Sequence, residues 1–132
     1  MSPELEKRIA EFCRDHKRIV AAYLFGSAAA GHLKPDSDID LALLLDGDPS
    51  SFDLLSFICA LERICNRRAD VIVLNNAGEF IKYEVRRKGR LIYETDPAAR
   101  KRFEILGRKR FEDYLFLHRR YAAAVLYGET HG

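Results

Sequence analysis

The sequence predicts a single α/β domain of the α+β kind. A small mixed sheet of about four strands is flanked by helices and followed by a long C-terminal helix. Three observations predict this fold. The 132 residues match the length of one domain, 48% of them are apolar, and residues 1–132 contain no linker or repeat. Short runs rich in β-branched and aromatic residues alternate with segments of helical periodicity. The last helical segment is much longer than the others.

The chain is expected to begin with a helix and a buried strand. Ser2 is predicted to cap the helix, Pro3 to occupy its first position, and Lys17 to lie near its end. The apolar side chains of one helical face recur at i, i+4, i+7 and i+8 and are Leu5, Ile9, Phe12 and Cys13. Residues 19–25 are β-branched, aromatic and otherwise apolar, which predicts a strand.

Two short polar motifs follow this strand. Gly26 permits a sharp turn and a close approach of the backbone to a ligand, and Ser27 opens an Ala-rich turn whose free N–H groups suit an anion. Asp38 and Asp40 stand at the start of the next predicted strand, residues 39–45. Residues two apart in a strand point to the same face, with Cα atoms ~6.6 Å apart. Two carboxylates at that spacing can converge on one or two hard cations, which prefer oxygen ligands.

A second Asp-x-Asp pair, Asp46 and Asp48, follows that strand. It has two interpretations, a further metal site or a solvated turn. We favour the turn, because Gly47 and Pro49 specify a turn and nothing in the sequence holds these two carboxylates together.

A helix is expected over residues 52–68. Ser50 and Asp53 resemble a variant of the capping box, and the apolar residues on most sides of the helix predict that it covers a face of the sheet. Arg67 and Arg68 at its end have two interpretations that the sequence leaves open. They complement the negative end of the helix dipole, or one of them reaches a nucleotide phosphate.

Asp70 opens the third predicted strand, residues 70–74. A carboxylate at the mouth of a buried strand is costly unless it is paired or bound to a cation. Taken alone, it is more often a strand-end cap. With Asp38 and Asp40 already placed, we interpret Asp70 as the third member of a catalytic set.

The remainder of the chain is expected to form a helix over residues 79–88, a strand over residues 90–94, and a long helix from Pro97 to about Tyr127. Gly107 disfavours the long helix by ~1 kcal/mol relative to Ala, which allows a kink or break there. This helix carries more apolar surface than one core needs. Either the surplus packs across the sheet, or one face docks a second protein or a second copy of the chain. We favour docking.

Charge is distributed unevenly along the sequence. The net charge is only +2, but residues 82–120 carry 13 Lys and Arg against 6 Asp and Glu, a net +7, which leaves the remainder at −5. Residues 36–48 hold five Asp and no Lys or Arg. We therefore expect an acidic region suited to cations and a basic surface suited to phosphate or to an acidic partner.

The three cysteines, Cys13, Cys59 and Cys65, have a spacing that fits no metal site. We expect reduced, buried thiols in a cytoplasmic protein. The N-terminal segment lacks the apolar core of a signal peptide, and no apolar run approaches the ~18 residues of a membrane-spanning helix.

Together these motifs carry a resemblance to a known family. Gly26-Ser27, ten intervening residues and Asp38-x-Asp40 resemble the signature of the DNA polymerase β-like nucleotidyltransferases, and the later strand with Asp70 resembles that superfamily's third carboxylate strand. The short chain is similar to the minimal nucleotidyltransferase (MNT) branch, including the MNT antitoxins that are paired with HEPN ribonuclease toxins.

The resemblance implies a nucleotidyltransferase fold and a role for each matching residue. Asp38 and Asp40 would bridge two Mg²⁺ ions, and Asp70 would bind the ion on the side of the nucleophile and help to deprotonate the incoming hydroxyl. Gly26 and Ser27 would hold the β- and γ-phosphates of ATP.

The expected activity is transfer of AMP from ATP to a hydroxyl of a partner protein. By resemblance to the MNT antitoxins, the acceptor is a tyrosine of a HEPN-type toxin. Three alternatives stay open: a non-catalytic antitoxin that neutralises its partner by docking, a small-molecule nucleotidyltransferase, and a polynucleotide-tailing enzyme. Small-molecule enzymes of this kind usually carry an extra domain, and no recognised RNA-binding motif supports nucleic acid. The chain is not expected to be the nuclease itself, because Arg110 and His118 are poorly placed together on a helix.

Overall fold

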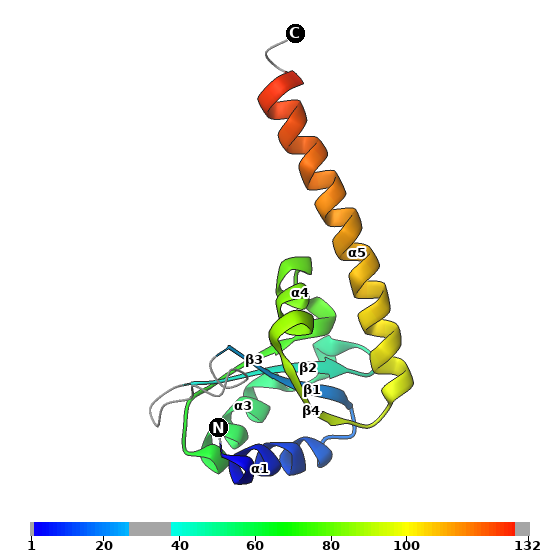
Figure 1. Cartoon of the computed structure of the whole chain (residues 1–132). Coiled ribbons are helices and arrows are strands. Elements are labelled where there is room, and N and C mark those ends of the chain that lie inside the picture. Colours follow the sequence, from blue (N-terminus) through cyan, green and yellow to red (C-terminus); the bar gives the residue numbers. More distant parts are fainter. Residues whose placement is uncertain (1, 27–37, 129–132) are drawn as a thin grey trace.

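A mixed sheet of four strands organises the computed structural model, which describes residues 2–26 and 38–128 (Figure 1). The helices and strands are α1 (Pro3–Arg14), β1 (Ile19–Phe25), β2 (Ile39–Leu45), α3 (Leu54–Cys65), β3 (Ala69–Val73), α4 (Glu79–Lys88), β4 (Arg90–Glu94) and α5 (Pro97–Ala123). The strand order is β3-β2-β1-β4, in which β2 and β3 are parallel and the other pairs antiparallel. The predicted fold class is therefore confirmed.

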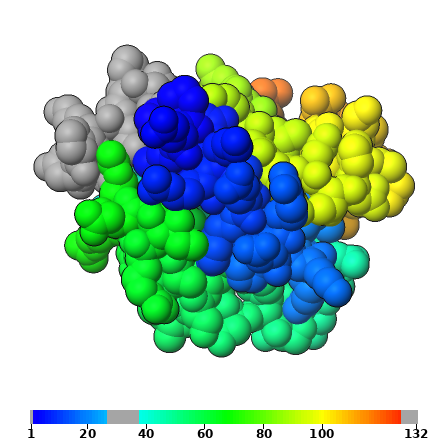
Figure 2. All heavy atoms as spheres, turned by 90° about the horizontal axis from the view of Figure 1, so that it is seen from below, coloured from blue at the N-terminus to red at the C-terminus, as the bar shows by residue number. Residues whose placement is uncertain are grey.

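Each face of the sheet has its own apolar core. Helices α1 and α3 cover one face, and Figure 2 shows them side by side in blue and green over that side of the molecule. Helix α4 and the first turns of α5 cover part of the other face. Because β1 and β2 are buried on both faces, they are apolar almost without interruption, as their sequences predict. Side chains that fill the first core include Ile9, Leu24, Leu41, Phe57 and Leu61.

Helix α1 begins as its sequence predicts. The Ser2 hydroxyl accepts a hydrogen bond from the Leu5 N–H at 3.2 Å, and Pro3 occupies the first turn. The helix ends at Arg14 and not near Lys17, because Asp15 is its C-cap and the following turn is closed by the Ile19 N–H donating to the His16 carbonyl.

The start of α3 differs from the expected one. Ser50 lies in a short 3₁₀ turn, Pro49–Ser51, whose cap is Asp48, and the side chain of Asp48 accepts from the Ser50 N–H. Asp53 then caps α3 by accepting from the Ser56 N–H at 3.1 Å. The proposed capping box of Ser50 and Asp53 is therefore wrong: two aspartates cap two successive turns. The carboxylate of Asp48 accepts hydrogen bonds from the N–H and the hydroxyl of Ser50 within the same turn, which agrees with the interpretation of Asp46 and Asp48 as parts of a turn.

The predicted long helix is present, and it passes through Gly107 without a break. It continues from Ala123 into a single π-helical turn, Ala124–Gly128. Near its start it is fixed to the sheet, where the Tyr23 hydroxyl donates to Glu104 at 2.7 Å. Beyond these first turns, Figure 1 shows α5 projecting well past the sheet.

One prediction about the cysteines is wrong. Cys13 and Cys65 are buried, and burial raises the pKa of the Cys13 thiol to about 12. Cys59, however, is exposed on α3, because it lies on the face of the helix that turns away from the sheet. Within the described residues, no helix has both the length and the apolar character needed to cross a bilayer.

Candidate active site

Asp40 and Asp70 are neighbours across the β2–β3 ladder. They are register partners on two parallel strands, so their side chains leave the sheet on the same face. On the other side of Asp40, the register partner on β1 is Phe25. Asp38 lies directly before β2 and is exposed. The fold thus gathers residues that are far apart in sequence at one end of two adjacent strands.

The electrostatics of this region are those of unneutralised carboxylates. The pKa of Asp40 is raised, first because the carboxylate is partly buried, and then because the charges of Asp70 and Asp38 lie close to it. Among the described residues, no Lys or Arg makes an ion pair with any of these three aspartates. An all-oxygen donor set that lacks a protein cation suits Mg²⁺, which binds through carboxylates.

The three carboxylates do not form a closed metal cage in the structure. Within the described parts of the chain, no three His, Cys, Asp or Glu side chains lie close enough to hold one ion together. Like charges repel one another when no cation is present, and the exposed side chains of Asp38 and Asp70 can change rotamer readily. The metal-binding roles of Asp38, Asp40 and Asp70 therefore stay predictions.

Gly26 forms the sharp turn that its sequence position predicts. Its φ is +63°, a conformation that L side chains rarely adopt, and a Cβ at this position would lie 2.5 Å from Oδ2 of Asp40. The absence of a side chain thus lets the backbone after β1 lie directly beside the Asp40 carboxylate. Ser27, the predicted phosphate-binding partner of Gly26, lies outside the described residues.

An apolar pocket of about 270 Å³ opens beside Asp70. Besides Asp70, its lining consists of one glutamate and apolar side chains from β1, β3 and α4: Phe25, Ile72, Phe80, Ile81, Glu84 and Val85. The sequence analysis did not identify Phe80 and Ile81. The structure identifies them, because α4 buries Lys82 and Val85 and yet leaves Phe80 and Ile81 59% and 45% exposed beside the pocket.

Arg67 and Arg68 lie in the connection between α3 and β3. The helix ends before them, at Asn66, which adopts the left-handed conformation with φ of 50°. The backbone carbonyl of Arg68 accepts from the Ile39 N–H at 2.9 Å, which joins this connection to the start of β2. Both arginines are therefore close in sequence to Asp70, and their side-chain roles stay predictions.

Paired carboxylates at the end of adjacent strands, beside a glycine turn, are the arrangement expected of metal-dependent phosphoryl-transfer enzymes. The family model described as polymerase beta nucleotidyltransferase matches residues 7–98, a segment that spans the sheet and all three aspartates. The chain belongs to this nucleotidyltransferase family. Among curated proteins, none matches the sequence.

Solved structures show the same fold. A chain of a toxin–antitoxin crystallised with AMP-PNP is 20% identical, with a TM-score of 0.72 over 96% of this chain and 98% of that chain. A chain of the complex between tri-AMPylated HEPN toxin and MNT antitoxin from Shewanella oneidensis is 18% identical, with a TM-score of 0.69 over 100% of both chains. A minimal nucleotidyltransferase is 24% identical, with a TM-score of 0.52 over 66% of this chain and 87% of that chain. The predicted resemblance to the MNT branch is confirmed at the level of the fold.

Proposed function

We propose that this protein is a Mg²⁺-dependent nucleotidyltransferase that moves AMP from ATP onto a tyrosine hydroxyl of a HEPN-type ribonuclease toxin, and that it acts as the antitoxin. The observation that carries the proposal is the register pairing of Asp40 with Asp70, next to Asp38 and without a basic partner among the described residues. The fold shared with chains of HEPN/MNT toxin–antitoxin complexes supports the choice of partner.

The carboxylates would divide the work of metal binding. Asp38 and Asp40 would hold both ions, and Asp70 would hold the ion on the acceptor side. Bound Mg²⁺ would neutralise the charge of the triphosphate and favour ionisation of the attacking hydroxyl. Gly26 and Ser27 would position the β- and γ-phosphates, since a glycine turn and free N–H groups suit phosphate oxygens.

The transfer itself forms one bond and breaks one bond. The tyrosine oxygen attacks the α-phosphorus of ATP, the bond from that phosphorus to the bridging oxygen of the β-phosphate breaks, and pyrophosphate leaves with the electron pair. The proton of the tyrosine hydroxyl passes to Asp70, which lies on the acceptor side in this assignment, and then to solvent.

The pocket beside Asp70 supports an aromatic acceptor. Its lining includes Phe25, Phe80 and Ile81, and a phenol ring packed against them would present its hydroxyl toward Asp70. A small-molecule acceptor rich in hydroxyl or amino groups would find few polar partners on these walls. The pocket therefore favours a tyrosine side chain that is brought by a partner.

The test is the mass of the toxin after incubation with this protein, ATP and Mg²⁺. We expect a gain of one or more AMP units that disappears with Asp70→Asn. The matched control is Asp46→Asn, which removes an exposed aspartate at the far end of β2 and should leave the transfer intact. Neutralisation of the toxin without any change in mass would show that the protein acts by docking alone.

A further inference from the structure

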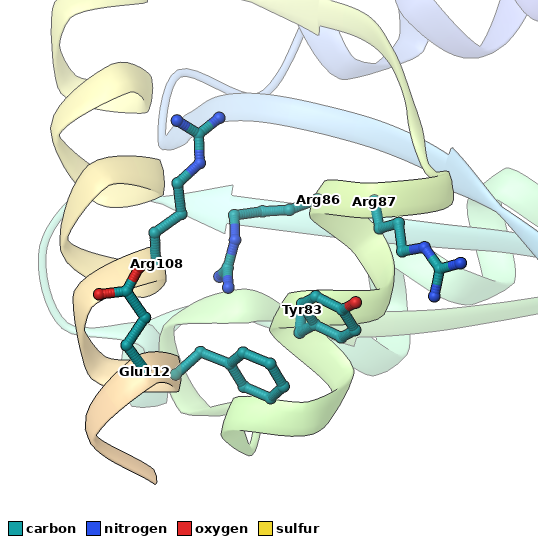
Figure 3. Close-up of a pocket in the computed structure, with 6 residues that line it drawn as sticks. Tyr83, Arg86, Arg87, Arg108 and Glu112 are labelled. Carbon is teal, nitrogen blue, oxygen red and sulfur yellow. The ribbon is translucent and has the colours of Figure 1, made fainter. Parts of the chain in front are cut away.

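A second cavity, of about 350 Å³, lies between α4 and α5 (Figure 3). Three arginines, one glutamate and two aromatic residues line it: Arg86, Arg87, Arg108, Glu112, Tyr83 and Phe111. It lies on a different side of α4 from the pocket beside Asp70, because Tyr83, Arg86 and Arg87 alternate along the helix with the residues of that pocket. Its volume is at the small end of the range for ligand-binding pockets.

Arg86 is the residue around which this cavity is built. Figure 3 shows its side chain reaching from α4 into the space before α5. There it meets Gly107, which is buried, and a Cβ on Gly107 would lie 2.5 Å from Nη1 of Arg86. Gly107, whose sequence position suggested a kink, instead allows a guanidinium to lie against the backbone of a straight helix.

The guanidinium of Arg86 has unused hydrogen-bonding capacity. Its Nη1 is buried against Gly107 and has no hydrogen-bond partner, although a buried charged group is costly when it is left unpaired. A ligand in the cavity would therefore bind through the other N–H groups of this guanidinium. The pKa of Arg86 is lowered, mainly by burial and then by the positive charge of Arg108, whereas Glu79, Glu104 and Tyr83 act in the opposite direction.

The carboxylates near Arg86 are largely engaged elsewhere. Both oxygens of Glu104 accept from Arg100 at 3.0 Å, and one oxygen of Glu79 accepts from Lys82 at 2.8 Å. The other oxygen of Glu79 is buried without a partner. Among the described residues, Arg86, Arg87 and Arg108 make no ion pair with any carboxylate. The lining of the cavity therefore holds three arginines and one carboxylate, that of Glu112, and the charges of Glu79 and Glu104 act on Arg86 from outside the lining.

The remaining wall is aromatic. The rings of Tyr83 and Phe111 stack on each other with centroids 4.2 Å apart and planes at 7°, so a ligand in the cavity meets the edges or an outer face of this pair. A ligand that complements both features has a phosphate at one end and a flat ring at the other. Guanidinium groups bind phosphate oxygens in a bidentate manner, and nucleobases stack on aromatic rings.

We propose that the cavity between α4 and α5 is a second nucleotide-binding site, in which Arg86 holds the phosphate of a nucleoside monophosphate and Tyr83 and Phe111 border its base. Arg108, whose guanidinium points away from that of Arg86 in Figure 3, turns toward the phosphate when the nucleotide binds. This site does not depend on Mg²⁺, because arginines and not carboxylates bind the phosphate. An acidic peptide segment of a partner would match the arginines but would leave the aromatic wall unused.

The experiment measures AMP binding by calorimetry in EDTA, with the Asp40→Asn variant as the host protein so that the aspartate site contributes nothing. We expect AMP to bind more tightly than inorganic phosphate, and Arg86→Gln to weaken AMP binding at least ~10-fold, since hydrogen bonds between a guanidinium and a phosphate are stronger than neutral ones. Arg108→Gln, which changes an exposed side chain and does not threaten folding, should weaken it less.

The matched control is Arg119→Gln, an exposed arginine further along α5 that does not line the cavity. It should leave AMP affinity unchanged. The proposal is overturned if AMP does not bind in EDTA, if it binds no better than inorganic phosphate, or if an acidic peptide binds and AMP does not. It is also overturned if Arg108→Gln and Arg119→Gln have equal effects. None of these outcomes depends on whether the protein transfers AMP to a toxin.

Discussion

Asp40 of β2 and Asp70 of β3 are register partners on parallel strands, and none of the described basic residues forms an ion pair with either of them. Carboxylates on adjacent strands in this position repel each other in the absence of a cation. The raised pKa of Asp40 has partial burial as its first cause and the charge of Asp70 as its second. The site is therefore expected to lower the stability of the metal-free protein.

The first prediction concerns Asp40→Asn in EDTA. A carboxyl whose folded-state pKa is raised binds its proton more tightly in the folded protein, so its ionisation costs stability as the pH rises from its ordinary pKa through the raised one. At pH 7 the variant should have a higher free energy of unfolding than the parent protein, and the difference should vanish at acid pH. Urea unfolding as a function of pH measures both quantities.

Addition of Mg²⁺ should reverse this order. A cation that binds only the folded state stabilises it by about 2.7 kcal/mol at a concentration of 100 times its dissociation constant. The parent protein should gain this stability, and Asp40→Asn should not. Equal stabilisation of both proteins by Mg²⁺ would show that Asp40 is not a ligand of the metal ion.

The second prediction compares two glycines with the same backbone strain. Gly26 and Gly47 have φ values of +63° and +75°, so alanine at either position should cost about 1–2 kcal/mol of stability. Only at Gly26 would the new Cβ meet Asp40, at 2.5 Å from Oδ2, whereas at Gly47 the nearest side-chain atom, Nη2 of Arg18, is at an ordinary 3.5 Å. We expect Gly26→Ala to lose AMP transfer and Gly47→Ala to retain it, both assayed well below their unfolding temperatures. Equal AMP transfer by the two variants would show that the turn at Gly26 plays no part in the reaction.

Much of the fold was predictable because its signals are local. The cap at Ser2, the apolar runs of β1 and β2 and the carboxylate at the start of β3 all depend on residues that are neighbours in the sequence. The pairing of Asp40 with Asp70 was predicted only in outline, because the order of strands in a sheet is set by packing between distant segments.

Two features that the sequence did not specify depend on contacts between segments. Gly107 is a weak helix former, but in the structure it lies against the guanidinium of Arg86 of α4, in the space that a side chain at position 107 would fill. Phe80 was missed because its pocket exists only once α4 is packed beside β1 and β3. No pattern within one helix specifies which side of it will border a pocket.

The third prediction tests the pocket beside Asp70 as the acceptor site. Phe80→Ala removes an aromatic wall that is 59% exposed, so the fold should be little affected. We expect a decrease of roughly 10-fold in kcat/KM for the toxin, because the loss of aromatic packing costs about 1–1.5 kcal/mol. Leu55→Ala is the matched control, since Leu55 is a 72% exposed apolar residue on α3, away from the pocket. ATP hydrolysis in the absence of toxin should be unchanged in both variants. If Phe80→Ala lowers ATP hydrolysis as much as it lowers kcat/KM for the toxin, Phe80 acts on nucleotide binding and not on the acceptor.

The fourth prediction concerns the exposed part of α5. Several exposed apolar side chains of α5 and of the π-helical turn that continues it fall within an arc of about 100° on one side of the helix: Leu106, Tyr114, Leu117, Tyr121 and Val125. We call this set the apolar stripe. Its members are 38–69% exposed, on a helix that extends past the sheet, and the domain itself offers them no core.

Leu117→Glu places a charge in the middle of the apolar stripe and should weaken binding to the toxin by at least ~100-fold, since burial of an unpaired charge in an interface costs several kcal/mol. Phe116→Glu is the matched control, because Phe116 is the adjacent residue, is exposed to a similar extent (59% against 64%) and lies outside the stripe. Binding by calorimetry and the mass of the protein in solution should be measured together. If Leu117→Glu converts a dimer of this chain to a monomer and leaves toxin binding unchanged, the stripe joins two copies of the chain, and the toxin must dock elsewhere.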